Sequence, residues 1–207
     1  GGTPSWYPSE HGFCYAPGAS AAIWDNVNSE HCCSLLYPNT FLVVILNKNI
    51  VDQEYANFCG VFEKFTQVYY VMDILAEVLK DAEVKNMLVN ESCRLDGCPF
   101  LAEELASMEA GELARVLIEG FAYREGRDEE RYAEERYILK PLYNLFFTRD
   151  ASSTVYDKVL INSMSFEVRR REILIYKAIF ENYFGCETFN AEACDPEART
   201  EGGDVQI

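Results

Sequence analysis

The stretch QEYANFCGVFEKFTQVYYVMDILAEVL, residues 53–79, decides the fold expected for this chain. Side chains at spacings of three and four lie on one face of an α-helix, because the helix turns once in about 3.6 residues. The stretch therefore predicts one long amphipathic helix, with its apolar face against other helices. The apolar residues at these spacings are Phe58, Phe62, Phe65, Tyr69, Met72, Ala76 and Leu79.

Three further segments carry helical patterns after this stretch. The second helix is expected to begin at Pro99, because proline suits the first helical position, and to bend near Gly111. The third is expected over about 128–148, with a proline kink inside it. The fourth is expected over 154–185, because a Thr-x-x-Asp capping pattern opens it and Gly185 suits the left-handed backbone of a helix end.

The segments on either side lack such periodicity. Residues 1–50 are rich in Pro, Gly, Ser and Asn, and we expect an irregular wrap over the helices. Residues 187–207 are mostly acidic and polar and predict an acidic C-terminal tail. With residues 51–186 as its helical core, the chain is predicted to be one mainly α domain. The expected architecture is an irregular, disulfide-stapled bundle of about four long helical segments.

The chain contains 8 cysteines, an even number spread over its length. This distribution favours disulfides formed in an oxidising compartment, and short loops favour the pairs Cys93 with Cys98 and Cys186 with Cys194. Asn90 opens an Asn-Glu-Ser sequence, a potential N-glycosylation site. Together these features predict a secreted or cell-surface glycoprotein. The expected disulfide cysteines are Cys14, Cys32, Cys33, Cys59, Cys93, Cys98, Cys186 and Cys194.

The charge of the chain limits its partners. The 34 acidic and 18 basic residues give a formal net charge of −16 at pH 7. Such a surface repels a phosphate backbone, so a nucleic-acid partner is not expected. The longest apolar run, residues 40–46, is too short for a membrane helix, and no membrane span is predicted.

No familiar catalytic constellation appears in the sequence. The motifs that mark serine hydrolases, phosphate-binding loops, dinucleotide folds, calcium loops and zinc fingers are all absent. Adjacent carboxylates such as Glu134 and Glu135 diverge by about 100° on a helix, so they do not converge on one site. We therefore expect no enzyme activity, no cofactor and no metal site.

Recognition of a protein partner is the function that remains. Arg169, Arg170 and Arg171 fan around a helix, where ion pairs within the molecule are the first interpretation and a partner patch the second. Tyr132 and Tyr137 lie on the third predicted helix, and tyrosine suits surfaces that become dry in a complex. These five residues are the expected contacts with a protein partner of unknown identity.

Two alternatives stay open beside this non-catalytic interaction protein. A carrier would hold a small apolar ligand or lipid in a cavity between helices. An enzyme would need an unrecognised site near His11 and His31, because these are the only histidines of the chain.

Overall fold

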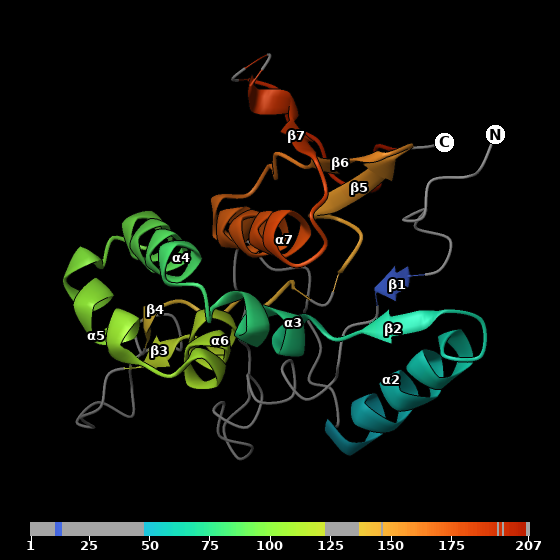
Figure 1. The fold of residues 1–207 in the computed structure, drawn as a ribbon, viewed down its shortest axis with the longest axis horizontal. Helices are drawn as coiled ribbons and strands as arrows, with labels where there is room; N and C mark the ends of the chain where they lie inside the picture. Colours follow the sequence, from blue (N-terminus) through green and yellow to red (C-terminus); the bar gives the residue numbers. More distant parts are fainter. Residues whose placement is uncertain are drawn as a thin grey trace, which may run out of the picture.

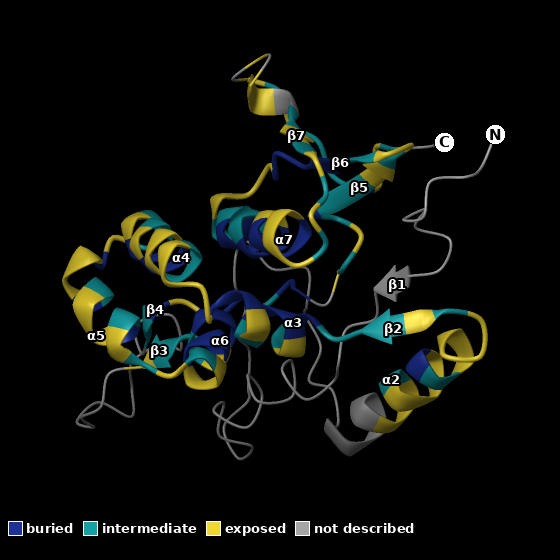
Figure 2. Cartoon of the chain, viewed as in Figure 1, coloured by how far each residue is buried: buried dark blue, intermediate teal, exposed yellow. Residues whose placement is uncertain are grey.

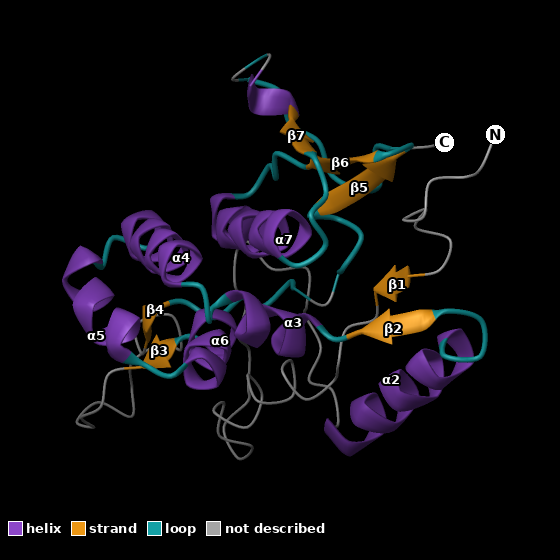
Figure 3. Ribbon diagram, viewed as in Figure 1, coloured by secondary structure: helices purple, strands orange, loops and turns teal. Residues whose placement is uncertain are grey.

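The computed structural model describes residues 11–13, 48–122, 137–145, 147–193, 195 and 197–205. In these ranges helices and short strands are mixed, so the expectation of a mainly α bundle is wrong (Figures 1 and 3). The helices are α2 (Lys48–Phe62), α3 (Val71–Val78), α4 (Ala82–Leu95), α5 (Ala102–Ser107), α6 (Ala110–Glu119) and α7 (Arg170–Asn182). The strands are β1 (His11–Phe13), β2 (Gln67–Tyr69), β3 (Phe121–Ala122), β4 (Tyr137–Leu139), β5 (Ser152–Val155), β6 (Lys158–Ile161) and β7 (Thr188–Asn190).

The long helix predicted over 53–79 is broken in its middle. α2 ends at Phe62, β2 follows, and α3 begins at Val71. The β-branched and aromatic residues of β2 favour an extended backbone, and β2 pairs in parallel with β1. Tyr70 continues the extended backbone up to the start of α3. The apolar stripe is therefore split, and Phe65 is 82% exposed.

The core of the described region lies where α3, α6 and α7 meet. α3 packs against both α6 and α7, and α4 packs against α7. Figure 2 shows the dark blue of buried residues concentrated on α3, α6 and α7. Leu75, Leu117 and Ile179 contribute fully buried aliphatic side chains from these three helices.

The second predicted helix is divided into three parts. A 3-10 turn at Pro99–Leu101 begins it, and its proline stands in the first turn as expected. α5 then ends at Ser107, and α6 begins at Ala110. The break falls at Met108 and Glu109, whose backbones are extended, whereas Gly111 lies inside α6.

In the described residues, β4 and turns stand in place of the third predicted helix, and a hairpin stands in place of the first part of the fourth. β4 pairs antiparallel with β3, and residues 128–136 of the predicted third helix lie outside the described residues. The Thr-x-x-Asp pattern belongs to the β5–β6 hairpin, where Val155 is paired with Lys158. Tyr156 opens the two-residue turn with a φ of 55°, the left-handed region that such hairpins require.

The second half of the fourth predicted helix is helical in the structure, as α7. It begins at Arg170 after a 3-10 turn and ends at Asn182. Gly185 has a φ of 64°, as a glycine after a helix end is expected to have. The chain then enters β7, which pairs in parallel with β6. Part of the segment expected as an acidic tail is thus built into this sheet.

Neither of the two disulfides predicted from short loops, Cys93 with Cys98 and Cys186 with Cys194, is formed. Cys93, Cys98 and Cys186 are free thiols. Burial raises the pKa of Cys93 to about 12, so its reactive thiolate is scarce at neutral pH. Cys59 lies buried in α2 and is disulfide-bonded, and the remaining predicted disulfide residues, Cys14, Cys32, Cys33 and Cys194, lie outside the described residues.

Secretion and glycosylation stay predictions, and the free thiols remove part of the argument for them. Asn90 is exposed, but it lies within α4 rather than in a loop. Among the helices that the structure describes, none combines the length and the apolar character that crossing a bilayer demands.

Candidate functional site

A buried ion pair between Arg169 and Glu172 is the centre of the candidate site. Arg169 ends the 3-10 turn before α7, and Glu172 stands three residues later, so the two side chains share one helical face. Both side chains are 1% exposed. The Arg169 Nη2 donates to Glu172 Oε2 at 2.8 Å, and its Nε donates to Oε1 at 3.1 Å. The planar guanidinium is thus held by both carboxylate oxygens.

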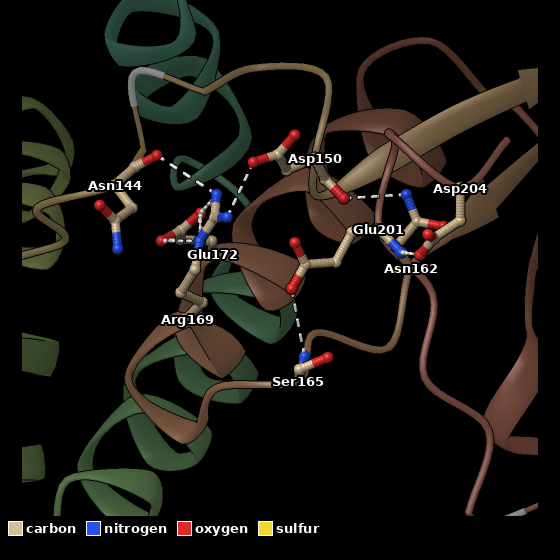
Figure 4. Close-up of polar contacts among 8 residues, drawn as sticks. All are labelled: Asn144, Asp150, Asn162, Ser165, Arg169, Glu172, Glu201 and Asp204. Atoms are coloured by element: carbon tan, nitrogen blue, oxygen red, sulfur yellow. Dashed lines mark hydrogen bonds and ion pairs between the residues drawn. The ribbon is translucent and has the colours of Figure 1, made fainter. Parts of the chain in front are cut away.

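Arg169 also holds the segment between β4 and β5. Its Nη1 donates to Asp150 Oδ2 at 2.8 Å, and its Nη2 donates to the backbone oxygen of Asn144 at 3.3 Å (Figure 4). The Phe147 ring centre lies 5.8 Å from the guanidinium carbon, within the range of a cation–π contact. One guanidinium therefore joins α7 to the segment that carries Asn144, Phe147 and Asp150.

The burial of these charges sets their pKa values. Burial raises the pKa of Glu172 from 4.5 to about 7, against the lowering effect of Arg169. Desolvation lowers the pKa of Arg169, but hydrogen bonds and charges of Glu172 and Asp150 outweigh it and leave the pKa raised. Asp150 and Glu201 also act on Glu172 and raise its pKa through their negative charges.

The raised pKa of Glu172 predicts a pH-dependent contribution to stability. Between about pH 4.5 and 7 the folded chain keeps a proton on Glu172 that the unfolded chain has released, so this contribution is full at low pH and is lost as the pH rises through 7. We expect the free energy of unfolding of the wild type, relative to that of Glu172→Gln, to fall by about 1 to 3 kcal/mol from pH 5 to pH 8. Urea unfolding of both proteins at the two pH values measures this change. A difference that stays constant over this range would show that the pKa is not raised.

Asp150 is the part of this cluster that water can reach. Its side chain is 27% exposed, whereas Arg169 and Glu172 are closed off. Its Oδ2 binds Arg169, while Oδ1 accepts no hydrogen bond from the described residues. Asp150 therefore has one oxygen bound to Arg169 and a second oxygen that no described donor occupies.

The segment at residues 197–205 adds a second carboxylate to the same place. Glu201 is half-buried, and its Oε1 accepts a hydrogen bond from the Ser165 backbone N–H at 3.4 Å. Figure 4 shows its carboxylate extending from this segment toward the Arg169 cluster. Asp204 follows in the segment and accepts from the Glu201 backbone N–H at 2.9 Å. Carboxylates from distant parts of the chain thus face one small region.

Buried amide groups line the cluster. Asn144 and Asn162 are almost fully buried, and the Oδ1 of each accepts no hydrogen bond from the described residues. Such orphaned acceptors are rare in folded proteins and mark polar sites. In the described part of the chain, no group of three histidine, cysteine or acidic side chains is arranged to hold a metal ion.

The structure places the three arginines predicted as partner contacts in different surroundings. Arg169 belongs to the cluster. Arg170 is 40% exposed and lies 3.9 Å from a carboxylate oxygen of Glu167. Arg171 is buried elsewhere, where it pairs with Asp96 at 3.0 Å. Two of the three guanidinium groups are therefore occupied inside the molecule.

Of the other two tyrosines and two histidines singled out from the sequence, Tyr137 is the one whose side chain the structure describes. Tyr137 is half-buried in β4, and Tyr132 lies outside the described residues. His11 stands in β1, of whose side chains nothing is described, and His31 also lies outside.

Sequence reasoning missed most of the acidic cluster. Asp150, Glu201 and Glu172 were not among the expected functional residues, although Arg169 and Glu172 have the spacing of an ion pair on one helix turn. A weaker signal was available in NLFFTRD, residues 144–150, where polar ends flank an apolar run. The convergence of Asp150 with Glu201 had no signal in spacing, because the two lie on separate segments.

Comparison with known proteins identifies the family. The family model described as arginine deiminase matches residues 41–207. The chain belongs to the arginine deiminase family. It is similar to an arginine deiminase of Oenococcus oeni (strain ATCC BAA-331 / PSU-1), with 25% identity over 176 residues, which cover 76% of this chain and 42% of that protein. The chain thus spans less than half the length of this curated relative.

Membership of this family corrects the function expected from the sequence. Both the family and the similar protein are named for an enzyme activity, so the prediction of a non-catalytic interaction protein is wrong, and so is the non-catalytic carrier alternative. No sequence motif marks the carboxylates of the candidate site, because they come from separate segments that meet only in the fold.

Proposed function

We propose that this chain supplies the arginine-binding part of an arginine deiminase, with Asp150 and Glu201 receiving the guanidinium group of the substrate. One observation carries the proposal: Asp150 already binds a guanidinium, that of Arg169, through Oδ2, while its side chain is part-exposed and its Oδ1 accepts no hydrogen bond from the described residues. The family name supports arginine as the ligand.

Carboxylates suit this ligand by charge and by geometry. A guanidinium is planar, permanently positive and rich in donors, and it pairs with carboxylate oxygens through short, charge-assisted hydrogen bonds. Glu201 approaches the cluster from a different segment than Asp150, so the two carboxylates are suited to hold the group from two sides. The net charge of −16 also favours the approach of a cation.

The same carboxylates suit the proton transfers of deimination. The reaction adds water to the guanidinium carbon, breaks one carbon–nitrogen bond and releases ammonia. A carboxylate within hydrogen-bond reach of the reacting group can accept a proton from the attacking water and return it to the leaving nitrogen. The part-exposed Asp150 and Glu201 can fill this role, whereas Glu172 is closed off by Arg169.

Removal of the Asp150 charge tests the binding site. We expect Asp150→Asn to weaken L-arginine binding by about tenfold to 100-fold, because a charge-assisted hydrogen bond is replaced by a neutral one. Calorimetric titration of the protein measures the affinity, and release of ammonia and citrulline measures turnover. L-Citrulline, which lacks the positive charge, should bind the wild type more weakly than arginine.

Asp157→Asn is the matched control, because Asp157 is exposed in the β5–β6 turn and its change removes the same charge away from the cluster. Its affinity for arginine should stay within about twofold of the wild type. Equal affinities of the two variants would contradict the role of Asp150. Absence of arginine binding by the wild type would contradict the proposed function as a whole.

A further inference from the structure

We infer that Gly202 is a positioning residue, whose lack of a side chain lets the 197–205 segment lie against the backbone at Asp150 and so brings Glu201 to the candidate site. The inference rests on the proposed function and adds to it a residue that touches no ligand. Three observations on the described residues support it. Gly202 lies very close to the Arg149 backbone, its N–H shares the Asp150 carbonyl oxygen with Asn162, and Thr200 is hydrogen-bonded to Ser163.

The close approach leaves no room for a side chain. Gly202 is buried, and a Cβ added to it would lie 2.0 Å from the backbone oxygen of Arg149 and 2.7 Å from its carbonyl carbon. The nearest atoms belong to the backbone rather than to the end of a flexible side chain. Any larger residue must therefore move the segment away from Arg149.

The shared acceptor is the carbonyl oxygen of Asp150. It receives the Gly202 backbone N–H at 3.2 Å and the Asn162 Nδ2 at 2.9 Å. A carbonyl oxygen has two lone pairs, so these two donors occupy both of them. They fix the backbone of Asp150, whose carboxylate then meets Arg169 on the other side.

The second anchor ties the same segment to the end of β6. Thr200 and Ser163 exchange two hydrogen bonds. The Thr200 backbone N–H donates to the backbone oxygen of Ser163 at 3.2 Å, and the Ser163 backbone N–H donates to Thr200 Oγ1 at 3.1 Å. Glu201 stands between this anchor and Gly202. Its place relative to Asp150 is therefore set from both sides.

Movement of the segment should harm ligand binding more than folding. A real Cβ does not come within 3.0 Å of such an atom, so alanine at Gly202 must displace the segment by about 1 Å. Displacements of this size at a reacting group can cost about 100-fold in rate. The three nearest atoms that the added Cβ would meet all belong to Arg149, and none belongs to the buried side chains of α3, α6 or α7.

The test compares Gly202→Ala with Gly203→Ala, a neighbouring exposed glycine whose added Cβ would meet nothing within 4 Å. We expect Gly202→Ala to lower the arginine affinity, and kcat/KM for arginine, at least tenfold. Gly203→Ala should stay within about twofold of the wild type. Thermal unfolding of both variants shows whether the fold is kept. Equal affinities of the two variants would overturn the inference.

A double variant separates positioning from a general structural effect. If Gly202 acts through Glu201, Glu201→Gln should weaken arginine binding clearly in the wild type and much less in Gly202→Ala. Equal effects in both backgrounds would contradict positioning. If Gly202→Ala does not fold, Thr200→Val removes the Oγ1 acceptor of the other anchor and should lower the affinity in the same direction. An unchanged affinity would count against the inference.

An arginine-free measurement distinguishes this inference from the proposed function. Amide chemical shifts at residues 149–153 should change in Gly202→Ala and not in Gly203→Ala. If the wild type fails to bind arginine while these shifts change, the proposed function fails and the contact of Gly202 with the Asp150 backbone stands. If arginine binds all variants equally, the positioning role fails and the proposed function stands.

Discussion

Arg169→Ala is expected to lower the free energy of unfolding by about 3 to 5 kcal/mol at about pH 8. The substitution leaves Glu172 buried without its cation, because both oxygens of that carboxylate are bound by Arg169. It also releases Asp150 and the backbone oxygen of Asn144. Equilibrium unfolding in urea, followed by circular dichroism, measures the change.

The run of arginines provides the control. Arg170 is 40% exposed, and its nearest carboxylate is 3.9 Å away, so Arg170→Ala should cost less than about 1 kcal/mol. The cost of Arg169→Ala should also shrink at about pH 5, where the raised pKa of Glu172 lets this side chain take up a proton. Similar costs for the two arginines would show that the buried pair does not stabilise the fold.

Leu117→Ala is expected to lower the free energy of unfolding by about 2 to 5 kcal/mol. Leu117 is 0% exposed on α6, which packs against α3, so truncation removes buried methyl groups and leaves a cavity. Urea unfolding measures the loss, and the slope of the transition should stay unchanged if only stability is affected.

Phe65→Ala is the control for this prediction, because the sequence pattern places Phe65 on the apolar face of one long helix. The structure leaves it 82% exposed after the end of α2, so its truncation should change stability by no more than about 0.5 kcal/mol. A loss comparable to that of Leu117→Ala would mean that Phe65 is buried in the folded protein.

Local patterns predicted part of the helical structure and missed α4, for which no helix was expected although Leu88, Val89 and Cys93 are buried on it. The residues of α3 and α7 were expected in helices, and Pro99 and Gly185 stand where their backbone preferences suggested. Strands were missed where a short apolar run suits helix and strand equally, as in β2 and β6. There the choice depends on a partner strand, and β1 and β7 lie far from their partners in the sequence.

The sequence by itself determined the acidic character of the chain, the helices around Leu75 and Ile179, and the helical spacing that pairs Arg169 with Glu172. Only the tertiary structure decided that Asp150 and Glu201 face this pair and that Gly202 must lack a side chain. Periodicity reports only which residues share a face of one element. The meeting of separate segments depends on which hydrogen bonds and apolar surfaces the whole chain can satisfy at once, and no local spacing carries that information.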